Sequence, residues 1–340
     1  MQPNTRLMFR AYALKVAVAN SVSSATAEQF NVIPAIEQRL EAAIQLESSF
    51  LRSINIEGVR DIKGEVVYGG VTGTIAGRTD TSGSGERNPR DVTSLSSLGY
   101  ECVQTDYDTG FPYARLDAWS SKPNFQALIS AQIVSQTALD RIMIGWNGTS
   151  RAATTNRVTN PLLQDVNKGW IQKYVDHSPE RVMTAGATPG VIKVGGTSPD
   201  YQNIDALVYQ AAAEMLHPRF VNSSEIMAMV GQNLLDEKYF PLINQDHKPT
   251  EYNALDMVMA SKKLGGYRVV VVPFLPAGTI VITAPKNLSI YYQTGSRRRQ
   301  LIDEPKKNRY ANYESVNEDF VVEEFPRGCV IKNIQFGGVL

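Results

Sequence analysis

Hydrophobic and polar residues alternate along this chain with several different periods, so helices and strands are expected in mixed order. In the first twenty residues, hydrophobic positions lie three and four apart, which predicts a short amphipathic helix with Thr5 as its N-cap. The hydrophobic face of this helix would consist of Leu7, Ala11, Leu14 and Val18. The Ser/Ala/Thr-rich stretch that follows, up to residue 30, is typical of an exposed linker.

The longest helix is expected to start at Pro123 and Asn124, because no further glycine or proline occurs until Gly145. A helix of about twenty residues is a rod about 30 Å long. Its second face is polar, so it is interpreted as a scaffold helix rather than a membrane span. Its hydrophobic face would consist of Phe125, Leu128, Ile129, Ile133, Leu139, Met143 and Trp146.

The remaining pattern predicts shorter elements without a repeating strand–helix–strand order, which indicates an α+β fold. A helix from residue 34 should give way to an extended piece that ends near residue 57. Another helix should begin with Asn160 as N-cap and Pro161 as its first residue. β-branched runs predict buried strands. The further helices are expected at 161–175, 203–217 and 232–240, and the strands at 267–273 and 279–284.

A glycine-rich stretch at 69–91 contains six glycines and raises the question of a phosphate-binding loop. A Walker A loop needs Gly-Lys before Ser or Thr, and this dipeptide is absent from the chain. The nearest match to GxGxxG, at 83–88, lacks the third glycine. Short β-rich runs flank this polar centre, and an unstructured loop of that length is uncommon in a compact domain. The segment is expected to be disordered, a lid, or an arm that packs on another molecule.

Composition narrows the class of protein. The 340 residues include 34 basic and 34 acidic ones, so the formal charge is zero and no global electrostatic footprint for nucleic acid or an anionic membrane exists. Cys102 and Cys329 have no CxxC partner and predict no disulfide framework. No apolar run is long enough to span a membrane. A signal peptide with Ala25-Thr26-Ala27 as its cleavage site is the less favoured alternative, because Lys15 interrupts its core.

The sequence offers no constellation for catalysis, a cofactor or a metal. The three histidines, His177, His217 and His247, are scattered and form no HExxH motif. No GxSxG elbow is present, and neither cysteine has a nucleophile context. We therefore predict no catalytic, cofactor-binding or metal-binding residues.

One charge pattern has three interpretations. The charges could bind a phosphate backbone through the basic block, form a solvated face, or form opposite patches that pair between identical subunits, and the last interpretation is favoured. The basic residues are Arg297, Arg298, Arg299, Lys306, Lys307 and Arg309. The acidic residues are Glu314, Glu318, Asp319, Glu323 and Glu324.

Several stretches, in this order and at these spacings, resemble the major capsid protein of P2-like (peduovirus) tailed bacteriophages over nearly the whole chain. They are TRLMFRAYALKVA, GVTGTIAGRTDT, GWNG, NPLLQDVNKGWIQKY, NLLDEKYFPLIN, NLSIYY and NRYANYESVNEDFVVEEF.

The resemblance implies an HK97-type capsid fold, which belongs to the α+β class. It would comprise an N-terminal precursor segment (1–30), an N-arm (31–57), an extended E-loop (58–118), a first peripheral part (119–200) with a spine helix at 124–145, an axial domain (201–285), and C-terminal strands that return to the peripheral domain (286–340). Proteolytic maturation would cut near Phe30 and Asn31.

The resemblance also implies partners and a place of action. Homo-hexamers and homo-pentamers would close into an icosahedral shell around double-stranded DNA, with an internal scaffolding protein that carries a protease and a portal protein at one vertex. Assembly would take place in the host bacterial cytoplasm, without a membrane. Contacts between subunits are expected at Glu86, Arg87, Arg90, Asp91, Arg297, Arg298, Arg299, Glu323 and Glu324.

Two alternatives remain beside this reading: an encapsulin-like nanocompartment shell and, with less support, a nucleic-acid-binding protein that uses residues 297–309. Some HK97-type capsids join neighbours covalently through a lysine near the E-loop tip. Here the tip has no lysine and Lys63 lies at the base, so no such cross-link is expected.

Overall fold

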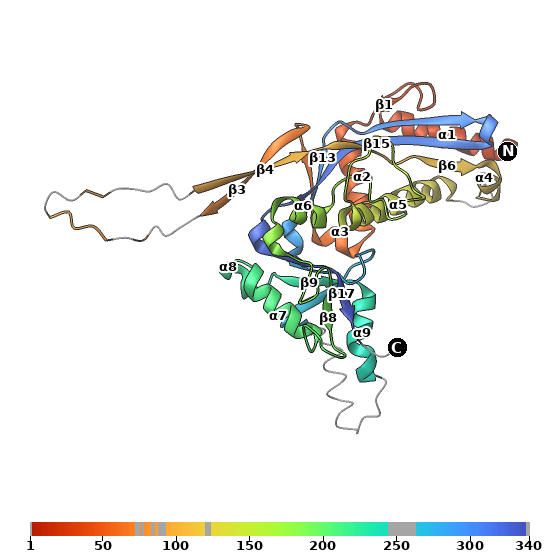
Figure 1. Cartoon of the computed structure of the whole chain (residues 1–340). Helices are drawn as coiled ribbons and strands as arrows, with labels where there is room; N and C mark the ends of the chain where they lie inside the picture. The colour runs from red at the N-terminus through yellow and green to blue at the C-terminus, as the bar shows by residue number, and fades with distance from the viewer. Residues whose placement is uncertain are drawn as a thin grey trace.

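The computed structural model describes residues 2–71, 76, 78–82, 86–87, 93–119, 124–243 and 263–337. Figure 1 shows an elongated upper part, a smaller lower part that carries the C-terminus, and a hairpin that extends away from both. The helices are α1 (Pro3–Ala19), α2 (Pro34–Leu46), α3 (Ser49–Ser53), α4 (Tyr113–Trp119), α5 (Phe125–Asn147), α6 (Trp170–His177), α7 (Ile204–Met215), α8 (Pro218–Val221) and α9 (Gln232–Ile243). The mixed order of helices and strands agrees with the predicted α+β class.

The upper part is organised around one long strand, β15 (Arg309–Val322), which has neighbours on both sides. Its first half pairs with β14 and β6, and its second half with β13 and β5. β1 and β2 complete this sheet at its two ends. The other strands of the sheet are β1 (Phe30–Asn31), β2 (Asn55–Val59), β5 (Val103–Asp106), β6 (Thr109–Pro112), β13 (Leu288–Gln293) and β14 (Arg298–Glu304).

The lower part contains a second sheet with the order β10-β11-β9-β12-β16-β7 and a two-stranded sheet of β8 and β17. Their hydrophobic core packs under α7, whose N-cap Asn203 accepts a hydrogen bond from the Ala206 amide at 2.8 Å. The strands are β7 (Val182–Met183), β8 (Ile192–Val194), β9 (Met227–Val230), β10 (Lys263–Leu264), β11 (Tyr267–Val271), β12 (Ile280–Thr283), β16 (Gly328–Ile331) and β17 (Ile334–Phe336). The helices predicted at 203–217 and 232–240 and the two predicted strands are confirmed.

The predicted long helix is confirmed as α5, with Asn124 in the N-cap position. Four of the seven residues predicted for its hydrophobic face are buried: Phe125, Ile129, Ile133 and Trp146; Ile142, which was not predicted, is buried as well. Leu139 is wrongly assigned, because its side chain is 37% exposed. Figure 1 shows α5 running below the strands of the upper sheet.

The face predicted for the first helix is wrong. In α1, Leu7, Leu14 and Val18 are more than half exposed, and the opposite face packs on the body. Thr5 is a fully buried residue inside the helix rather than its N-cap. The physical reason is that both faces of α1 are apolar, and the second one carries the aromatic rings. The buried residues of α1 are Thr5, Phe9, Tyr12, Ala13, Val16 and Ala17.

The helix predicted at 161–175 begins later than expected. Turns occupy the chain after Asn160, and α6 starts only at Trp170. A Cβ on Gly169 would lie 2.3 Å from the carbonyl oxygen of Gly145, so the chain touches the backbone of α5 there. Leu163 has φ +58°, a left-handed conformation that a continuous helix does not allow. Close packing on α5 thus overrides the local helix signal.

Two further predictions concern covalent bonds and membranes. Cys102 and Cys329 are free and buried, which agrees with the expected absence of a disulfide between them. Among the described residues, no helix combines the length and the apolar character that crossing a membrane requires. His247 lies outside the described residues.

Candidate functional site

The hairpin of β3 (Lys63–Val71) and β4 (Thr93–Glu101) is the part of the molecule that stands furthest from its own cores (Figure 1). The strands pair antiparallel, from Lys63 opposite Glu101 to Val71 opposite Thr93. A two-stranded hairpin is marginally stable at best in water when nothing packs on it. This projecting hairpin is therefore the first candidate for contact with another molecule.

The charged residues predicted at the hairpin tip fall partly within the described chain. Glu86 and Arg87 are exposed, whereas Arg90 and Asp91 lie outside the described residues. The Asp80 carboxylate accepts hydrogen bonds from the Ser82 hydroxyl and, at 2.9 Å, from the Ser82 amide. These bonds hold the pKa of Asp80 below its ordinary value. The tip thus presents both signs of charge to solvent.

A chain of ion pairs ties the root of the hairpin to the body. Glu101, at the end of β4, lies 2.6 Å from the Lys63 ammonium and 3.0 Å from the Arg151 guanidinium. Arg151 also pairs with the buried Asp319 at 2.9 Å, and Asp319 pairs with Lys173 at 3.0 Å. The Glu101 amide donates a further hydrogen bond to Asp319 at 3.0 Å. The direction in which the hairpin leaves the body is therefore fixed by charges at its base.

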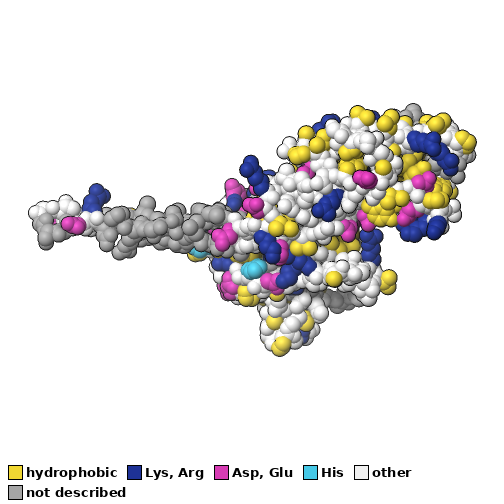
Figure 2. Space-filling view, turned by 90° about the horizontal axis from the view of Figure 1, so that it is seen from above, with side chains coloured by type: hydrophobic (Ala, Val, Ile, Leu, Met, Phe, Trp, Pro, Cys, Tyr) yellow, Lys and Arg dark blue, Asp and Glu magenta, His cyan; other side chains and the backbone are white. Residues whose placement is uncertain are grey.

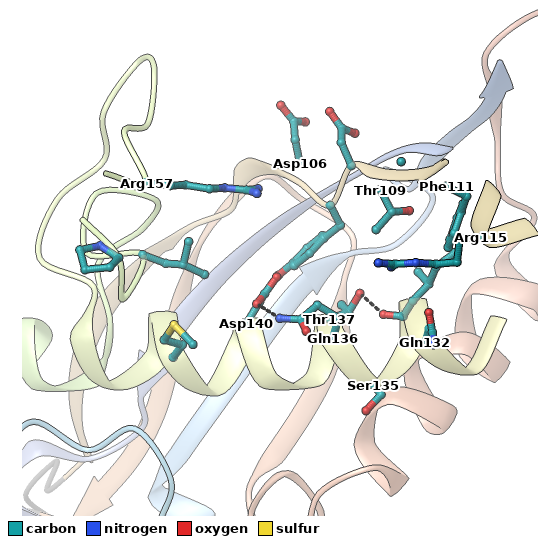
Figure 3. Close-up of a pocket in the computed structure, with 17 residues that line it drawn as sticks. Asp106, Thr109, Phe111, Arg115, Gln132, Ser135, Gln136, Thr137, Asp140 and Arg157 are labelled. Carbon is teal, nitrogen blue, oxygen red and sulfur yellow. Dashed lines mark hydrogen bonds between the residues drawn. The ribbon is translucent and has the colours of Figure 1, made fainter. Parts of the chain in front are cut away.

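A cleft of about 670 Å³ lies between the β5–β6 turn and α5, and Figure 3 shows its lining. Arg157 reaches into it from a loop and Arg115 from α4, and Asp140 and Gln136 rise from α5, whereas the Asp106 carboxylate at its rim points away from α5. Ser135 points away from it. The complete lining is Asp106, Tyr107, Asp108, Thr109, Gly110, Phe111, Arg115, Gln132, Ile133, Ser135, Gln136, Thr137, Asp140, Met143, Arg157, Pro161 and Leu163.

The carboxylates of this cleft are partly desolvated and have only neutral donors as hydrogen-bond partners. Asp140 accepts from the Gln136 amide at 2.7 Å, and Asp108 from the Glu314 backbone amide at 3.2 Å. Burial raises the pKa of both carboxyls. Among the lining residues there is neither a histidine nor a cysteine. The cleft holds charges of both signs, the aspartate carboxylates and the guanidinium groups of Arg115 and Arg157.

The polar centre of the upper part is a buried ion-pair network between helices and the long strand. Arg141, on α5, is fully buried and lies 2.5 Å from Glu41 on α2 and 2.9 Å from Glu318 on β15. The Tyr107 hydroxyl donates a hydrogen bond to Glu318 as well. Burial pushes the pKa of Glu41 upward, but the guanidinium groups of Arg141 and Arg297 outweigh it and leave this pKa below its ordinary value.

This network corrects the predicted charge blocks. Arg297 is 1% exposed and pairs with Glu41 and Glu314 inside its own subunit, so the surface role proposed for it is wrong. Glu314, Glu318 and Asp319 are also buried, and they form no acidic surface patch. The reason is topological: β15 has strands on both sides and helices below, so charges on it can only be stabilised by internal partners.

The rest of the basic block is divided between solvent and local partners. Arg298, Lys306 and Lys307 are exposed. Arg299 is half-buried and donates to Asn312 at 2.7 Å, and Arg309 donates to Glu304 at 2.5 Å. Because Arg297 is buried and Arg309 is paired with Glu304, residues 297–309 form no continuous basic surface. This weakens the nucleic-acid-binding alternative.

The two acidic residues predicted at the surface after β15 are half-buried. The Glu323 carboxylate accepts hydrogen bonds from the Ser289 hydroxyl and, at 3.0 Å, from the Tyr291 hydroxyl. The Glu324 amide donates to the Asn287 side chain at 2.8 Å. The Glu323 carboxylate therefore has partners within the subunit, and Glu324 is held through its backbone amide; contacts of either with a neighbour stay a prediction.

The predicted cut lies in an ordered part of the chain. Phe30 and Asn31 form β1 and pair with β14, and the Val32 amide donates to the Arg297 carbonyl at 2.8 Å. Phe30 is buried, with 9% of its surface exposed. The bond between the two residues is therefore held in the sheet, where a protease cannot bind the chain until β1 detaches.

The segment before this point packs on the body through α1. The Phe9 ring stacks on Tyr310 with 3.7 Å between centroids, and the Tyr12 hydroxyl accepts from Arg299 at 2.9 Å. The body supplies the other half of this core with Phe111, Leu116, Phe125, Ile129, Ile133, Leu301 and Tyr310.

Sequence reasoning missed four charged residues that the structure places at the centre of these arrangements: Glu41, Arg141, Arg151 and Lys173. The available signal was weak. Arg141 is the one cation in the sequence of α5 and precedes the hydrophobic residues 142–144, and such a residue needs a counter-charge if it is buried.

These surfaces define a class of protein. A projecting arm, a cleft without catalytic groups and charges largely used in internal ion pairs are features of a structural subunit that acts through contacts with other molecules.

The profile of the family described as "Phage major capsid protein, P2 family" matches residues 8–334. The chain belongs to this family: it is a phage major capsid protein, a structural component of the virion that associates with itself into a capsid shell and is not an enzyme.

Individual relatives agree along the whole length. The chain is 40% identical to the "Capsid proteins" of Escherichia phage P2 over 344 residues, which cover 99% of this chain and 96% of the relative. It is 39% identical to the major capsid protein of Serratia phage KSP20, with 99% and 98% covered. Both matches include the N-terminal segment that the sequence analysis set apart.

Solved structures confirm the HK97-type fold. A chain of the satellite phage P4 procapsid that includes the size determination (Sid) protein superposes with a TM-score of 0.81, at 40% identity and 99% coverage of both chains. The capsid of an empty GTA particle shares the fold at 13% identity, with a TM-score of 0.51 and coverage of 85% and 90%. Because the chain belongs to the phage capsid family, it is a phage shell protein and not the encapsulin-like alternative.

Proposed function

We propose that copies of this chain assemble as hexamers and pentamers into an icosahedral procapsid, which encloses double-stranded DNA through non-specific contacts. An internal scaffolding protein with a protease and a portal protein at one vertex would take part, in the host bacterial cytoplasm. The observation that carries this proposal is the hairpin of β3 and β4, which leaves its own subunit and whose root is fixed by ion pairs.

The hairpin would lie on a neighbouring subunit. Ordering a chain costs about 1–2 kcal/mol per residue, so contacts with a neighbour must offset the cost for the tip. Glu86, Arg87, Arg90 and Asp91 are the charges proposed to make them. The cleft beside α5 offers a matching surface, because it holds both carboxylates and the guanidinium groups of Arg115 and Arg157.

Deletion of residues 78–90 tests this contact. The variant should remain a folded, soluble subunit, because these residues contribute to none of the described cores. Co-expressed with scaffolding protein, it should give no stable shells in negative-stain electron microscopy. Normal particles from this variant would refute the proposed contact between the hairpin and a neighbouring subunit. The pair D106N/D140N tests the cleft and should reduce the yield of shells, whereas E180Q, whose side chain is 66% exposed, is the matched control.

We also propose that maturation removes residues 1–30 by a cut between Phe30 and Asn31. Support comes from the way the chain is held on the two sides. On the N-terminal side of the proposed cut, the chain is held by the packing of α1. On the C-terminal side, the Glu37 carboxylate accepts a hydrogen bond from the Gly295 amide at 2.8 Å, and Glu41 belongs to the buried ion-pair network. The N-arm would therefore stay in place when the precursor segment leaves. N-terminal sequencing of protein from mature particles tests this, and a first residue other than Asn31 contradicts it.

The two sheets support a division into peripheral and axial domains. The upper sheet collects strands from 55–59, 103–112 and 288–322, as expected for a peripheral domain that the chain leaves and re-enters. The lower sheet also includes β7 and β16, which lie outside 201–285. With β8 and β17, which join the same core, we therefore propose an axial domain built on 201–285 that includes two strands from each flanking segment.

A further inference from the structure

Helix α1 has two apolar faces on opposite sides. One face packs on the body through Phe9, Tyr12 and Val16. The other comprises Leu7, Ala11, Leu14 and Val18, all exposed; the side chains of Leu7, Leu14 and Val18 are 64%, 62% and 69% exposed. At 3.6 residues per turn, the centres of the two faces lie about 180° apart. A helix that is apolar on two opposite sides normally buries both, and no described residue covers the outer face.

The outer face has the spacing of a coiled-coil seam. Its four residues follow one another at intervals of four, three and four, which is the d-a-d-a order of a heptad repeat. In that register Arg10 occupies a g position and Lys15 an e position, on the two flanks of the seam. Figure 2 shows hydrophobic and basic side chains together at the end of the molecule opposite the hairpin, where α1 lies in Figure 1.

The charges on the flanks select the partner. Arg6, Arg10 and Lys15 are exposed and form no ion pair with another described residue, and the first 27 residues contain no acidic side chain. In a parallel pair of two α1 helices, Arg10 of one copy would face Lys15 of the other across the seam. An antiparallel pair would likewise bring cations together. Like charges at e and g positions disfavour pairing, so a second copy of α1 is a poor occupant.

We propose that the outer face of α1 docks an amphipathic helix of another protein, with apolar residues along its seam and acidic residues on both flanks. Such a helix would bury Leu7, Leu14 and Val18 and place carboxylates beside Arg10 and Lys15. The proposal rests on the face itself and holds whether or not residues 1–30 are later removed. If they are removed, the docking site leaves with them, and the interaction is confined to the uncleaved subunit.

A designed peptide tests the proposal on the full-length, purified subunit. The probe is a fluorescent three-heptad helix with Leu at a and d and Glu at e and g; the control peptide has Lys at e and g. Fluorescence anisotropy should show binding of the Glu peptide alone, weakened by added salt because its flanking ion pairs are exposed. Equal binding of both peptides, or no binding of the Glu peptide at about 1 mM, overturns the proposal.

Variants locate the binding site. L7Q/L14Q should weaken binding of the Glu peptide at least tenfold and leave the circular dichroism spectrum of the subunit unchanged, because both side chains are exposed. V158Q removes an apolar side chain that is 90% exposed elsewhere and should have no effect. R10E/K15E should reverse the preference, so that this variant binds the Lys peptide more tightly than the Glu peptide. If L7Q/L14Q instead abolishes self-association seen in sedimentation velocity, a second copy is the occupant and the proposal is wrong.

Discussion

The guanidinium of Arg141 and the carboxylate of Glu41 lie 2.5 Å apart between α5 and α2, and both side chains are buried. This pair joins α2 to α5, and the second carboxylate on Arg141, from Glu318, adds the long strand β15. Three elements that are distant in sequence thus meet at one cation.

Replacement of Arg141 should therefore destabilise the subunit strongly. R141M keeps the approximate length of the side chain but removes the cation beside the buried Glu318 and one of the two arginines that pair with Glu41, which costs about 3–5 kcal/mol. Chemical denaturation of the isolated subunit measures the loss. R298Q, at an exposed arginine, should change the free energy of unfolding by less than about 0.5 kcal/mol.

A double variant separates the ion pair from general packing. E41Q removes one of the two carboxylates that pair with Arg141. The free energy of unfolding of R141M/E41Q should therefore fall by less than the sum of the losses in the two single variants. Additive losses would show that the charges of Arg141 and Glu41 are not coupled.

The same network predicts loss of stability in acid. The folded-state pKa values of Glu41 and Glu314 lie below the ordinary 4.5 despite their burial, because arginines outweigh the desolvation. A depressed carboxyl pKa contributes stability that is fully present above the unfolded-state pKa and is lost as the pH falls through the folded-state value. The free energy of unfolding should therefore decrease as the pH is lowered below 4.5.

Urea denaturation at a series of pH values tests this. E314Q should flatten the acid limb of the curve because it removes one of the two titrating groups. E180Q, at an exposed side chain, should reproduce the wild-type curve. An acid limb that is identical in E314Q and wild type contradicts the assignment.

The hairpin root predicts an effect on dynamics. Arg151 bridges Glu101 and Asp319, so R151Q should loosen the attachment of β4. Because the buried Asp319 then has one cation fewer, the free energy of unfolding should fall by about 1–3 kcal/mol. Hydrogen exchange measured by mass spectrometry should become faster in residues 93–101. K168Q breaks a more exposed ion pair, with Asp176, and is the control: exchange in 93–101 should stay unchanged.

Elements with a complete local pattern were predictable from the sequence. α5 and α7 follow a start signal and an uninterrupted helical period, and β12 is a continuous β-branched run that the structure buries on both faces. The fold and the family followed from stretches whose order and spacing are specific. In each of these cases the information lies within one short segment.

The assignment of charges to the surface failed because its outcome depends on distant partners. Arg141 and Glu318 are 177 positions apart, and Arg297 and Glu41 are 256 apart. No local period shows that such residues meet. α1 failed for a different reason: both of its faces are apolar, and periodicity alone does not tell which one packs on its own subunit.

Covalent joining of subunits through the hairpin is not expected in mature particles. Isopeptide formation needs a lysine amine that attacks the side-chain amide of an asparagine and releases ammonia, and residues 79–91 contain no lysine. Lys63 lies at the root, where its ammonium pairs with Glu101 at 2.6 Å. Particles boiled in SDS should run as a single monomer band on electrophoresis. A ladder of multimers that disappears in K63R would show that the root lysine reaches a neighbour, and would contradict this prediction.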